Sequence, residues 1–162
     1  MGKVIRDWNA LAAALEEFRT AGKTIVSTNG VFDVLHVGHV RYLQAARDLG
    51  DCLVVGVNSD EGTTHLKGPT RPFVKESDRM ELLAALTCVD FVTLFNESTP
   101  EALLEVIRPN IHAKGGDYHL ALLPEATVVE RHGGKVVSVP FDEGYSTTSL
   151  TERIGHVLAD RG

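Results

Sequence analysis

The sequence predicts an α/β protein built on a doubly wound parallel sheet of about five strands, with helices on both faces. Short apolar runs rich in Val and Ile alternate along the chain with longer segments whose apolar residues recur at helical spacing. The run from Asp51 to Asp60 is nearly continuously apolar until its polar end, which is typical of a buried parallel strand. Glycine and polar residues follow these runs, where a sheet of this kind binds its ligand.

The chain begins with a segment that is expected to be helical. Its 162 residues predict one domain, 1–162, in which residues 1–22 contribute a leading helix. Asp7 can cap this helix, and Leu11 and Leu15 belong to one apolar stripe along it. We therefore expect the helix to pack on the body of the domain.

The remaining elements alternate between strand and helix. The polar segment from Glu61 to Lys75 interrupts this alternation, and we expect a long loop there. Thr99 can cap the helix that follows the third strand, with Pro100 at its first helical position. Strands are expected over 24–27, 51–60, 90–95, 111–114 and 135–140, and helices over 38–49, 76–86, 99–108, 124–132 and from 149 onward.

Composition limits the classes of partner. Sixteen basic and 22 acidic residues give a net charge of −6, which argues against a nucleic-acid-binding protein. The N-terminus lacks the apolar core of a signal peptide, and no apolar run approaches the roughly 18 residues of a membrane span. Cys52 and Cys88 stand in apolar surroundings and are expected to be buried free thiols. We therefore expect a cytoplasmic protein that binds neither nucleic acid nor membrane.

The most informative stretch is Thr28–His39, between the first strand and the next helix. Backbone N–H groups at the start of such a helix attract anions. Gly30 and Gly38 remove side chains where the backbone must turn or approach a ligand. His36 and His39 lie three positions apart, so both rings could reach one phosphoryl group as N–H donors that carry charge near neutral pH. The stretch therefore predicts a phosphate site that stabilises negative charge developing on oxygen.

Other interpretations of the histidines fit the sequence less well. Two histidines at this spacing can ligate zinc or iron, but the adjacent segments add only Asp33 and no cysteine. No metal site is therefore predicted, and a metal-dependent hydrolase using these three side chains is disfavoured. Lone histidines are usually surface or core residues, yet the glycines, the preceding strand and the following helix favour phosphate here. The motifs of serine hydrolases, P-loop kinases and dinucleotide-dependent dehydrogenases are absent from the sequence.

Further polar segments are expected near this loop, at the carboxyl edge of the sheet. Lys67 and Arg71 give the long loop positive character in an acidic chain. Lys114–Asp117 forms a glycine turn after the fourth strand. Ser146–Thr148 precedes the last helix and offers more hydroxyl donors than one helix cap requires. Together these segments predict an anion-binding site.

The string TNGVFDVLHVGHVRYLQAA resembles the signature of nucleotidyltransferases that carry an HxGH motif, which include cytidylyltransferases, pantetheine-phosphate adenylyltransferase and class I aminoacyl-tRNA synthetases. Over nearly the whole chain, the sequence is similar to the adenylyltransferase domain of the bacterial ADP-heptose synthases, which implies a Rossmann-like fold. It would be a free-standing version of that domain, without the sugar kinase domain. The segments that carry this similarity are 58–60, 66–72, 114–118, 132–134 and 144–148.

The resemblance implies a reaction and its participants. ATP and D-glycero-β-D-manno-heptose 1-phosphate would give ADP-heptose and pyrophosphate, for heptose-containing glycans of the lipopolysaccharide type. Mg²⁺ would accompany ATP as the cofactor, because metal ions bridge transferring phosphates in such chemistry. The partners would be these two substrates and a second copy of the chain, since the family often forms homo-oligomers, commonly dimers.

The resemblance also implies a role for each matching residue. The catalytic residues would be His36, His39, Lys67 and Arg79. The nucleotide-binding residues would be Asn29, Gly30, Val31, Phe32, Gly38, Lys114, Gly116, Asp117, Tyr145, Ser146, Thr147 and Thr148. The substrate-binding residues would be Asp33, Asn58, Asp60, Lys67 and Arg71. Two roles have alternatives: Arg79 contacts phosphate or orders the site, and Asp33 fixes the loop or approaches the acceptor.

Two departures disfavour the cytidylyltransferase branch. Phe141–Glu143 stands where glycerol-phosphate cytidylyltransferases carry an Arg-Thr pair, and Val31 stands where they often have Thr. A cytidylyltransferase or an FAD synthetase of the same superfamily remains the alternative. A catalytically silent, nucleotide-binding regulatory module is a hypothesis from a different class. It would require a broken motif, and the expected residues are present.

Overall fold

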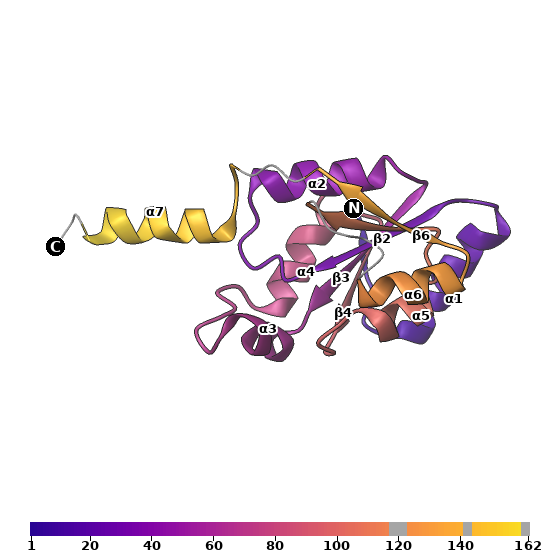
Figure 1. The fold of residues 1–162 in the computed structure, drawn as a ribbon, viewed down its shortest axis with the longest axis horizontal. Helices are drawn as coiled ribbons and strands as arrows, with labels where there is room; N and C mark the ends of the chain where they lie inside the picture. Colours follow the sequence, from indigo (N-terminus) through magenta and orange to yellow (C-terminus); the bar gives the residue numbers. More distant parts are fainter. Residues whose placement is uncertain (117–122, 141–143, 160–162) are drawn as a thin grey trace.

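The computed structural model describes residues 1–116, 123–140 and 144–159. The predictions for Asp117 and for Phe141–Glu143 fall outside these residues. The centre of the fold is a parallel sheet, shown in Figure 1, whose six described strands have the order β1-β4-β3-β2-β5-β6. The strands are β1 (Lys3–Val4), β2 (Ile25–Gly30), β3 (Cys52–Asn58), β4 (Phe91–Phe95), β5 (Ile111–Gly115) and β6 (Lys135–Val139).

The strand order confirms the doubly wound α/β prediction. From β2 the chain adds β3 and β4 on one side, and then adds β5 and β6 on the other side. The direction of winding therefore reverses between β2 and β5, and ligands of such sheets bind at this reversal. The sheet has one strand more than expected, because β1 has two residues and is too short to show a period in the sequence. It pairs with the edge of β4.

Helices cover both faces of the sheet. On one face, α2 (Val37–Arg47) and α4 (Glu76–Ala84) pack on alternate residues of the central strands. On the other face, α1 (Trp8–Thr20) and α5 (Glu101–Ile107) bury Leu11, Leu15 and Leu103 against the sheet. Helix α6 (Pro124–Arg131) packs on α5 and β6. The amide N–H of Asn9 donates to the Asp7 side chain, so the predicted cap of α1 is confirmed.

Two local predictions were wrong. The polar segment predicted as a loop begins with a helix, α3 (Asp60–Lys67), and only the part after Lys67 is loop. Its helical pattern is hidden because it buries only Gly62 and Thr63, while the Ser59 hydroxyl caps it by accepting from the Gly62 N–H at 3.0 Å. The cap of α5 is Pro100 and not Thr99, whose hydroxyl donates instead to the Glu101 carboxylate.

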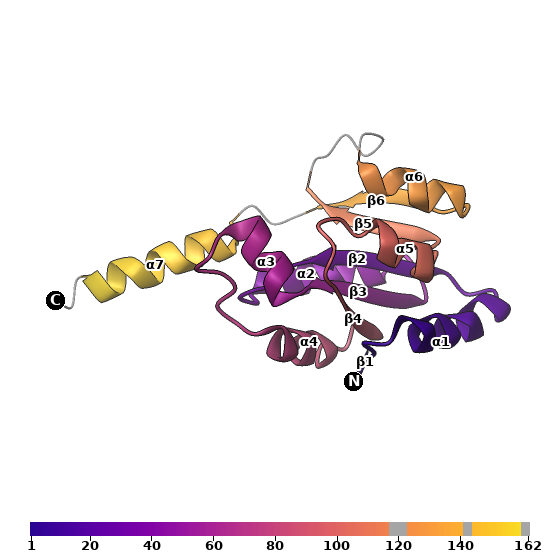
Figure 2. The same ribbon diagram turned by 90° about the horizontal axis from the view of Figure 1, so that it is seen from below.

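The last helix, α7 (Thr147–Ala159), stands apart from the body of the protein. Figure 1 and Figure 2 show it projecting away from the sheet, and none of its residues is buried. Ile154, Val157 and Leu158 are each at least 51% exposed. In the part of the chain that the structure describes, no helix is long and apolar enough to cross a lipid bilayer.

Candidate active site

A cavity of about 490 Å³ opens at the carboxyl ends of β2 and β5, where the winding of the sheet reverses. The cavity is lined by six residues that the sequence predicted for the site and by three that it did not predict. The predicted residues are Asn29, Gly30, Phe32, His39, Lys67 and Lys114, and the others are Tyr42, Gly115 and Leu123. The segment 31–39, which we call the histidine loop, therefore meets the end of α3 and the end of β5 at one place.

The loop after β2 turns sharply at Phe32. This residue has a φ of 51°, a left-handed backbone conformation that residues other than glycine rarely adopt. Its ring folds back over Gly30, where an added Cβ would lie 3.1 Å from the ring. The ring also meets the His39 ring edge-on, with 5.4 Å between centroids. Gly30 is therefore needed so that Phe32 can support the catalytic candidate His39.

His36 and His39 form a stacked pair at the start of α2. Their ring centroids are 3.8 Å apart, and the amide N–H of His36 donates to Nδ1 of His39 at 3.3 Å. Because Nδ1 accepts this bond, the proton of a neutral His39 ring lies on Nε2. A side chain at Gly38 would come within 3.0 Å of the His36 ring and of Tyr145. Gly38 thus makes room for protein side chains.

Burial controls the charge of the pair. Burial lowers the pKa of His36. Burial and the nearby His36 ring together lower the pKa of His39 to about 4. Both rings are therefore neutral at pH 7 in the ligand-free protein. They offer N–H donors to a phosphate, and a bound polyanion would favour their protonation.

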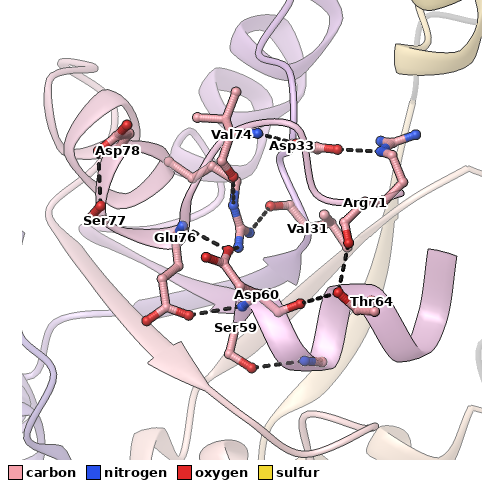
Figure 3. A network of polar contacts seen from close by, with 12 residues as sticks. Val31, Asp33, Ser59, Asp60, Thr64, Arg71, Val74, Glu76, Ser77 and Asp78 are labelled. Atoms are coloured by element: carbon pink, nitrogen blue, oxygen red, sulfur yellow. Dashed lines mark hydrogen bonds and ion pairs between the residues drawn. The ribbon is translucent and has the colours of Figure 1, made fainter. Parts of the chain in front are cut away.

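Arg79 is enclosed by protein groups. Its side chain is 0% exposed, and its guanidinium donates to the carbonyl oxygens of Val74 and Val31 and to the Asp60 carboxylate. Figure 3 shows this network, in which the Glu76 amide N–H also donates to Asp60. Since Val31 precedes the turn at Phe32, Arg79 ties α4 and α3 to the histidine loop. The geometry favours the ordering role over direct phosphate contact.

Asp33 is also engaged with protein groups. Its carboxylate accepts from the amide N–H groups of Phe73 and Val74, at 2.7 and 2.9 Å, and it pairs with Arg71 (Figure 3). The Arg71 guanidinium stacks on the Phe73 ring at 4.5 Å. Of the two roles expected for Asp33, the geometry favours fixing the loop. It also holds Arg71 on the side of the histidine loop.

Tyr42 joins two strands beneath the cavity wall. Its hydroxyl lies 2.6 Å from the Thr28 hydroxyl and donates to the carbonyl of Ala113 at 3.0 Å. Its place in the helical stripe of the sequence gave only a core signal, so its position in the cavity could not be predicted. Leu123 had no signal except that it precedes Pro124, and Gly115 lay within the predicted glycine turn.

The C-terminal segment reaches the site through Tyr145. This side chain contacts the position of Gly38, and the Arg41 guanidinium lies 5.4 Å from its ring centroid. Ser146 caps α7, because the Ser149 N–H donates to its hydroxyl at 3.0 Å. Among the described lining residues of the cavity, none comes from α7.

The other predicted residues that the structure describes also lie outside the lining of the cavity; besides those of the C-terminal segment they are Val31, Asp33, His36, Gly38, Asn58, Asp60, Arg71, Arg79 and Gly116. Asn58 is buried at the end of β3. Gly116 follows β5 with a φ of 99°, and Asp117 is outside the described residues.

The side chains of the described residues do not gather as a cage for a metal ion. Within the three described ranges, no group of three or more His, Cys, Asp or Glu side chains could hold one.

Comparison with known proteins decides the family. Residues 27–153 match the family described as Cytidylyltransferase-like. The chain belongs to this family. Membership confirms the expected nucleotidyltransferase, and the matched residues include the histidine loop, the cavity and the start of α7.

Curated relatives in the family are similar over most of the chain. A bifunctional protein HldE from Geotalea uraniireducens is 51% identical over 93% of this chain, and one from Syntrophotalea carbinolica is 50% identical over the same share. The chain spans 31% of the length of each relative.

Solved structures agree on the fold. The lipopolysaccharide core biosynthesis protein from Thermoplasma volcanium has a TM-score of 0.62 and 31% identity, over 77% of this chain and 100% of that one. A pantoate-beta-alanine ligase from Francisella tularensis has a TM-score of 0.60 at 12% identity, over 88% of this chain and 68% of that one, and supports the fold alone.

Proposed function

We propose that this chain is an adenylyltransferase that joins ATP and D-glycero-β-D-manno-heptose 1-phosphate into ADP-heptose and pyrophosphate. The observation that carries the proposal is its 51% identity to a bifunctional protein HldE over 93% of the chain. The lipopolysaccharide core biosynthesis protein among the similar structures supports the same pathway. ATP enters as its Mg²⁺ complex, and we place the enzyme in the cytoplasm, where ATP is made.

The reaction needs positioning and charge stabilisation more than proton transfer. A phosphate oxygen of the sugar 1-phosphate attacks the α-phosphorus of ATP and forms a new P–O bond. The bond from the α-phosphorus to the bridging oxygen breaks, and pyrophosphate leaves with that electron pair. The attacking phosphate is already ionised, so no general base is required. His36 and His39 donate hydrogen bonds to the triphosphate, and Lys67 neutralises the charge that develops.

The cavity residues suggest how the nucleotide lies. Asn29, Gly30, Phe32 and Lys114 line the cavity, and the Lys114 ammonium group donates to the Asn29 side-chain oxygen at 3.4 Å. Val31 and Gly38 belong to the histidine loop. We assign the base and ribose to the end of β5, with Gly116 and Asp117, because Lys114 and Gly115 line the cavity there. We assign the β- and γ-phosphates to Ser146, Thr147 and Thr148, which Tyr145 anchors beside α2.

We assign the acceptor sugar phosphate to the side of the histidine loop that contacts the loop after α3. Asp33 holds Arg71 there, and Arg71 offers a planar fork of N–H donors that suits a phosphate. Asn58 lies at the adjacent strand end. Asp60 and Arg79 position this region through their pairing.

We also propose that the enzyme works as a homo-oligomer, in the simplest case a dimer. The apolar side chains along α7 are exposed, and an isolated helix of 13 residues is marginal in water unless it packs on something. Sedimentation velocity should show a dimer that becomes monomeric in the double variant I154E/L158E. A wild-type monomer would refute the proposal.

The test of the reaction is pyrophosphate release. ATP, CTP and GTP are crossed with heptose 1-phosphate, glycerol 3-phosphate and FMN, for the wild type, H39A and H65A. His65 is an exposed histidine on α3 and serves as the matched control. We expect activity only with ATP and heptose 1-phosphate, unchanged in H65A and reduced at least about 100-fold in H39A, as for loss of one preorganised donor.

The other outcomes contradict the proposal in different ways. Turnover with CTP or with FMN would retain the chemistry and identify a cytidylyltransferase or an FAD synthetase. Binding of ATP by the wild type without turnover of any pair would identify the silent regulatory module.

A further inference from the structure

Glu125 lies next to the cavity and has no role in the proposed reaction. It is in the first turn of α6 and is 4% exposed. One of its carboxylate oxygens lies 2.7 Å from the ammonium group of Lys114, a cavity-lining residue. The same ammonium group donates to the side-chain oxygen of Asn29 at 3.4 Å, and Asn29 lines the cavity as well.

The pair is ionised despite its burial. Burial by itself would raise the pKa of Glu125, but the hydrogen bond and the positive charge from Lys114 hold this pKa below its usual value. Removing two charges from water often costs more than their attraction returns, so such a pair gives little net stability compared with apolar residues. Its presence beside a cavity therefore points to a function.

Among the described residues beside the pair is a buried polar side chain that carries no charge, His112. His112 lies two residues before Lys114 on β5 and is 0% exposed, and its Nδ1 is 2.7 Å from the Ser27 hydroxyl. Burial lowers the pKa of His112 to about 3, so the ring is neutral at pH 7. Glu125 is thus the carboxylate that compensates the charge of Lys114.

The geometry limits what Lys114 can do for a ligand. An ammonium group has three N–H donors. Among the described residues, Glu125 takes one and Asn29 takes another, so the third is left for a ligand in the cavity. Because Glu125 cancels the positive charge, this donor suits an uncharged acceptor atom, such as a ring nitrogen or a ribose hydroxyl, better than a phosphate.

We propose that Glu125 is a positioning residue that holds Lys114 beside Asn29 and directs it toward the nucleoside part of the nucleotide. The inference rests on the proposed function, since it assumes that the cavity binds ATP. Without the carboxylate, the flexible lysine would regain its rotamers, and its positive charge would no longer be compensated. It would then bind any polyphosphate and no longer select the nucleoside.

The test compares two ligands by titration calorimetry. One is α,β-methylene ATP, which carries the nucleoside, and the other is inorganic tripolyphosphate, which does not. The variant is E125Q, and the matched control is E130Q, because Glu130 is exposed on the same helix. We expect E125Q to bind the nucleotide analogue about tenfold more weakly, as for one charge-assisted hydrogen bond. Its affinity for tripolyphosphate should be unchanged or higher.

A second comparison separates positioning from simple loss of structure. In a K114M background, E125Q should have no further effect on binding of the analogue, because Glu125 acts through Lys114. If E125Q fails to fold, E125D keeps the charge on a shorter side chain and should show the same selective loss to a smaller degree.

The inference is overturned if E125Q binds the analogue as E130Q does, if both ligands weaken together, or if the effects of K114M and E125Q add. Failure of the proposed function is a separate result. In that case the wild type itself would release no pyrophosphate from ATP with any sugar phosphate.

Discussion

Replacing Arg79 with Met should destabilise the protein far more than its single change of charge suggests. The guanidinium is fully buried and donates to the carbonyls of Val31 and Val74 and to Asp60. Met fills similar space but leaves both carbonyl oxygens without a donor. Each lost charge-assisted hydrogen bond should cost about 1.5–3 kcal/mol of unfolding free energy. The Asp60 side chain is 39% exposed and can be rehydrated, so its share is at most about 1 kcal/mol.

We therefore expect R79M to lose about 4 kcal/mol of unfolding free energy, in the range of about 3–5 kcal/mol measured when one partner of a buried ion pair is removed. At about 2–4 °C per kcal/mol for a chain of this size, the melting temperature should fall by roughly 10 °C. Urea unfolding can be followed by the fluorescence of Trp8, the single tryptophan, whose indole N–H donates to the Leu94 carbonyl in the folded protein.

The control is R131M, because Arg131 is 60% exposed and, among the described residues, forms a surface ion pair with Glu105. Its unfolding free energy should stay within about 0.5 kcal/mol of the wild type. R79K should lie between the two, since lysine can keep the charge but not all three bonds. The reasoning is refuted if R79M unfolds at the same urea concentration as R131M while losing pyrophosphate release. Arg79 would then act on the reacting phosphates and not through the fold.

Three further predictions concern single side chains. In D33N, the loss of the charge that holds Arg71 should raise KM for the sugar phosphate about tenfold with little change in kcat. The control D48N, at the exposed end of α2, should behave as the wild type. An unchanged KM in D33N would contradict the role of Arg71. The native protein should lose stability as pH falls from 6.5 toward 4, because His39 takes up a proton at its ordinary pKa of 6.5 in the unfolded chain but only near 4 in the folded protein. In urea titrations, the unfolding free energy of H39N should fall less than that of the wild type over this interval. An equal fall in both proteins would refute the assignment. Burial raises the pKa of Cys52 to about 12 and also raises the pKa of Cys88. A disulfide reagent at pH 8 should therefore label neither thiol until urea unfolds the protein. Fast labelling without urea would show that one of the thiols is accessible.

The features predicted well from sequence are those that a local pattern determines. The apolar run of β3 is buried along its whole length, and the cap and stripe of α1 are as expected. The histidine loop could be located because glycine, a preceding strand and a following helix occur together. In each case the residues that carry the signal are adjacent or lie one helical turn apart.

The features that were missed depend on contacts between distant segments. Helix α3 has little apolar periodicity, and contacts of Asp60 with α4 and of Thr64 with the following loop help to hold it. Arg79 and Asp33 lie in a matching motif, yet only the structure shows how far each is enclosed by backbone groups from other elements. The sequence between Lys114 and Glu125 gives no reason for the two side chains to meet.

The anchoring of the loop after α3 has a consequence for how substrate choice can diverge. The Asp33 carboxylate accepts hydrogen bonds from the backbone N–H groups of residues 73 and 74, and every residue except proline has such a group. These two bonds do not depend on the side chains at positions 73 and 74, so the loop side chains other than Arg71 can vary through mutation while the course of the loop remains fixed beside the histidines. A descendant of this protein could acquire a new sugar phosphate by changing the loop side chains alone, without rebuilding the machinery that transfers the nucleotide.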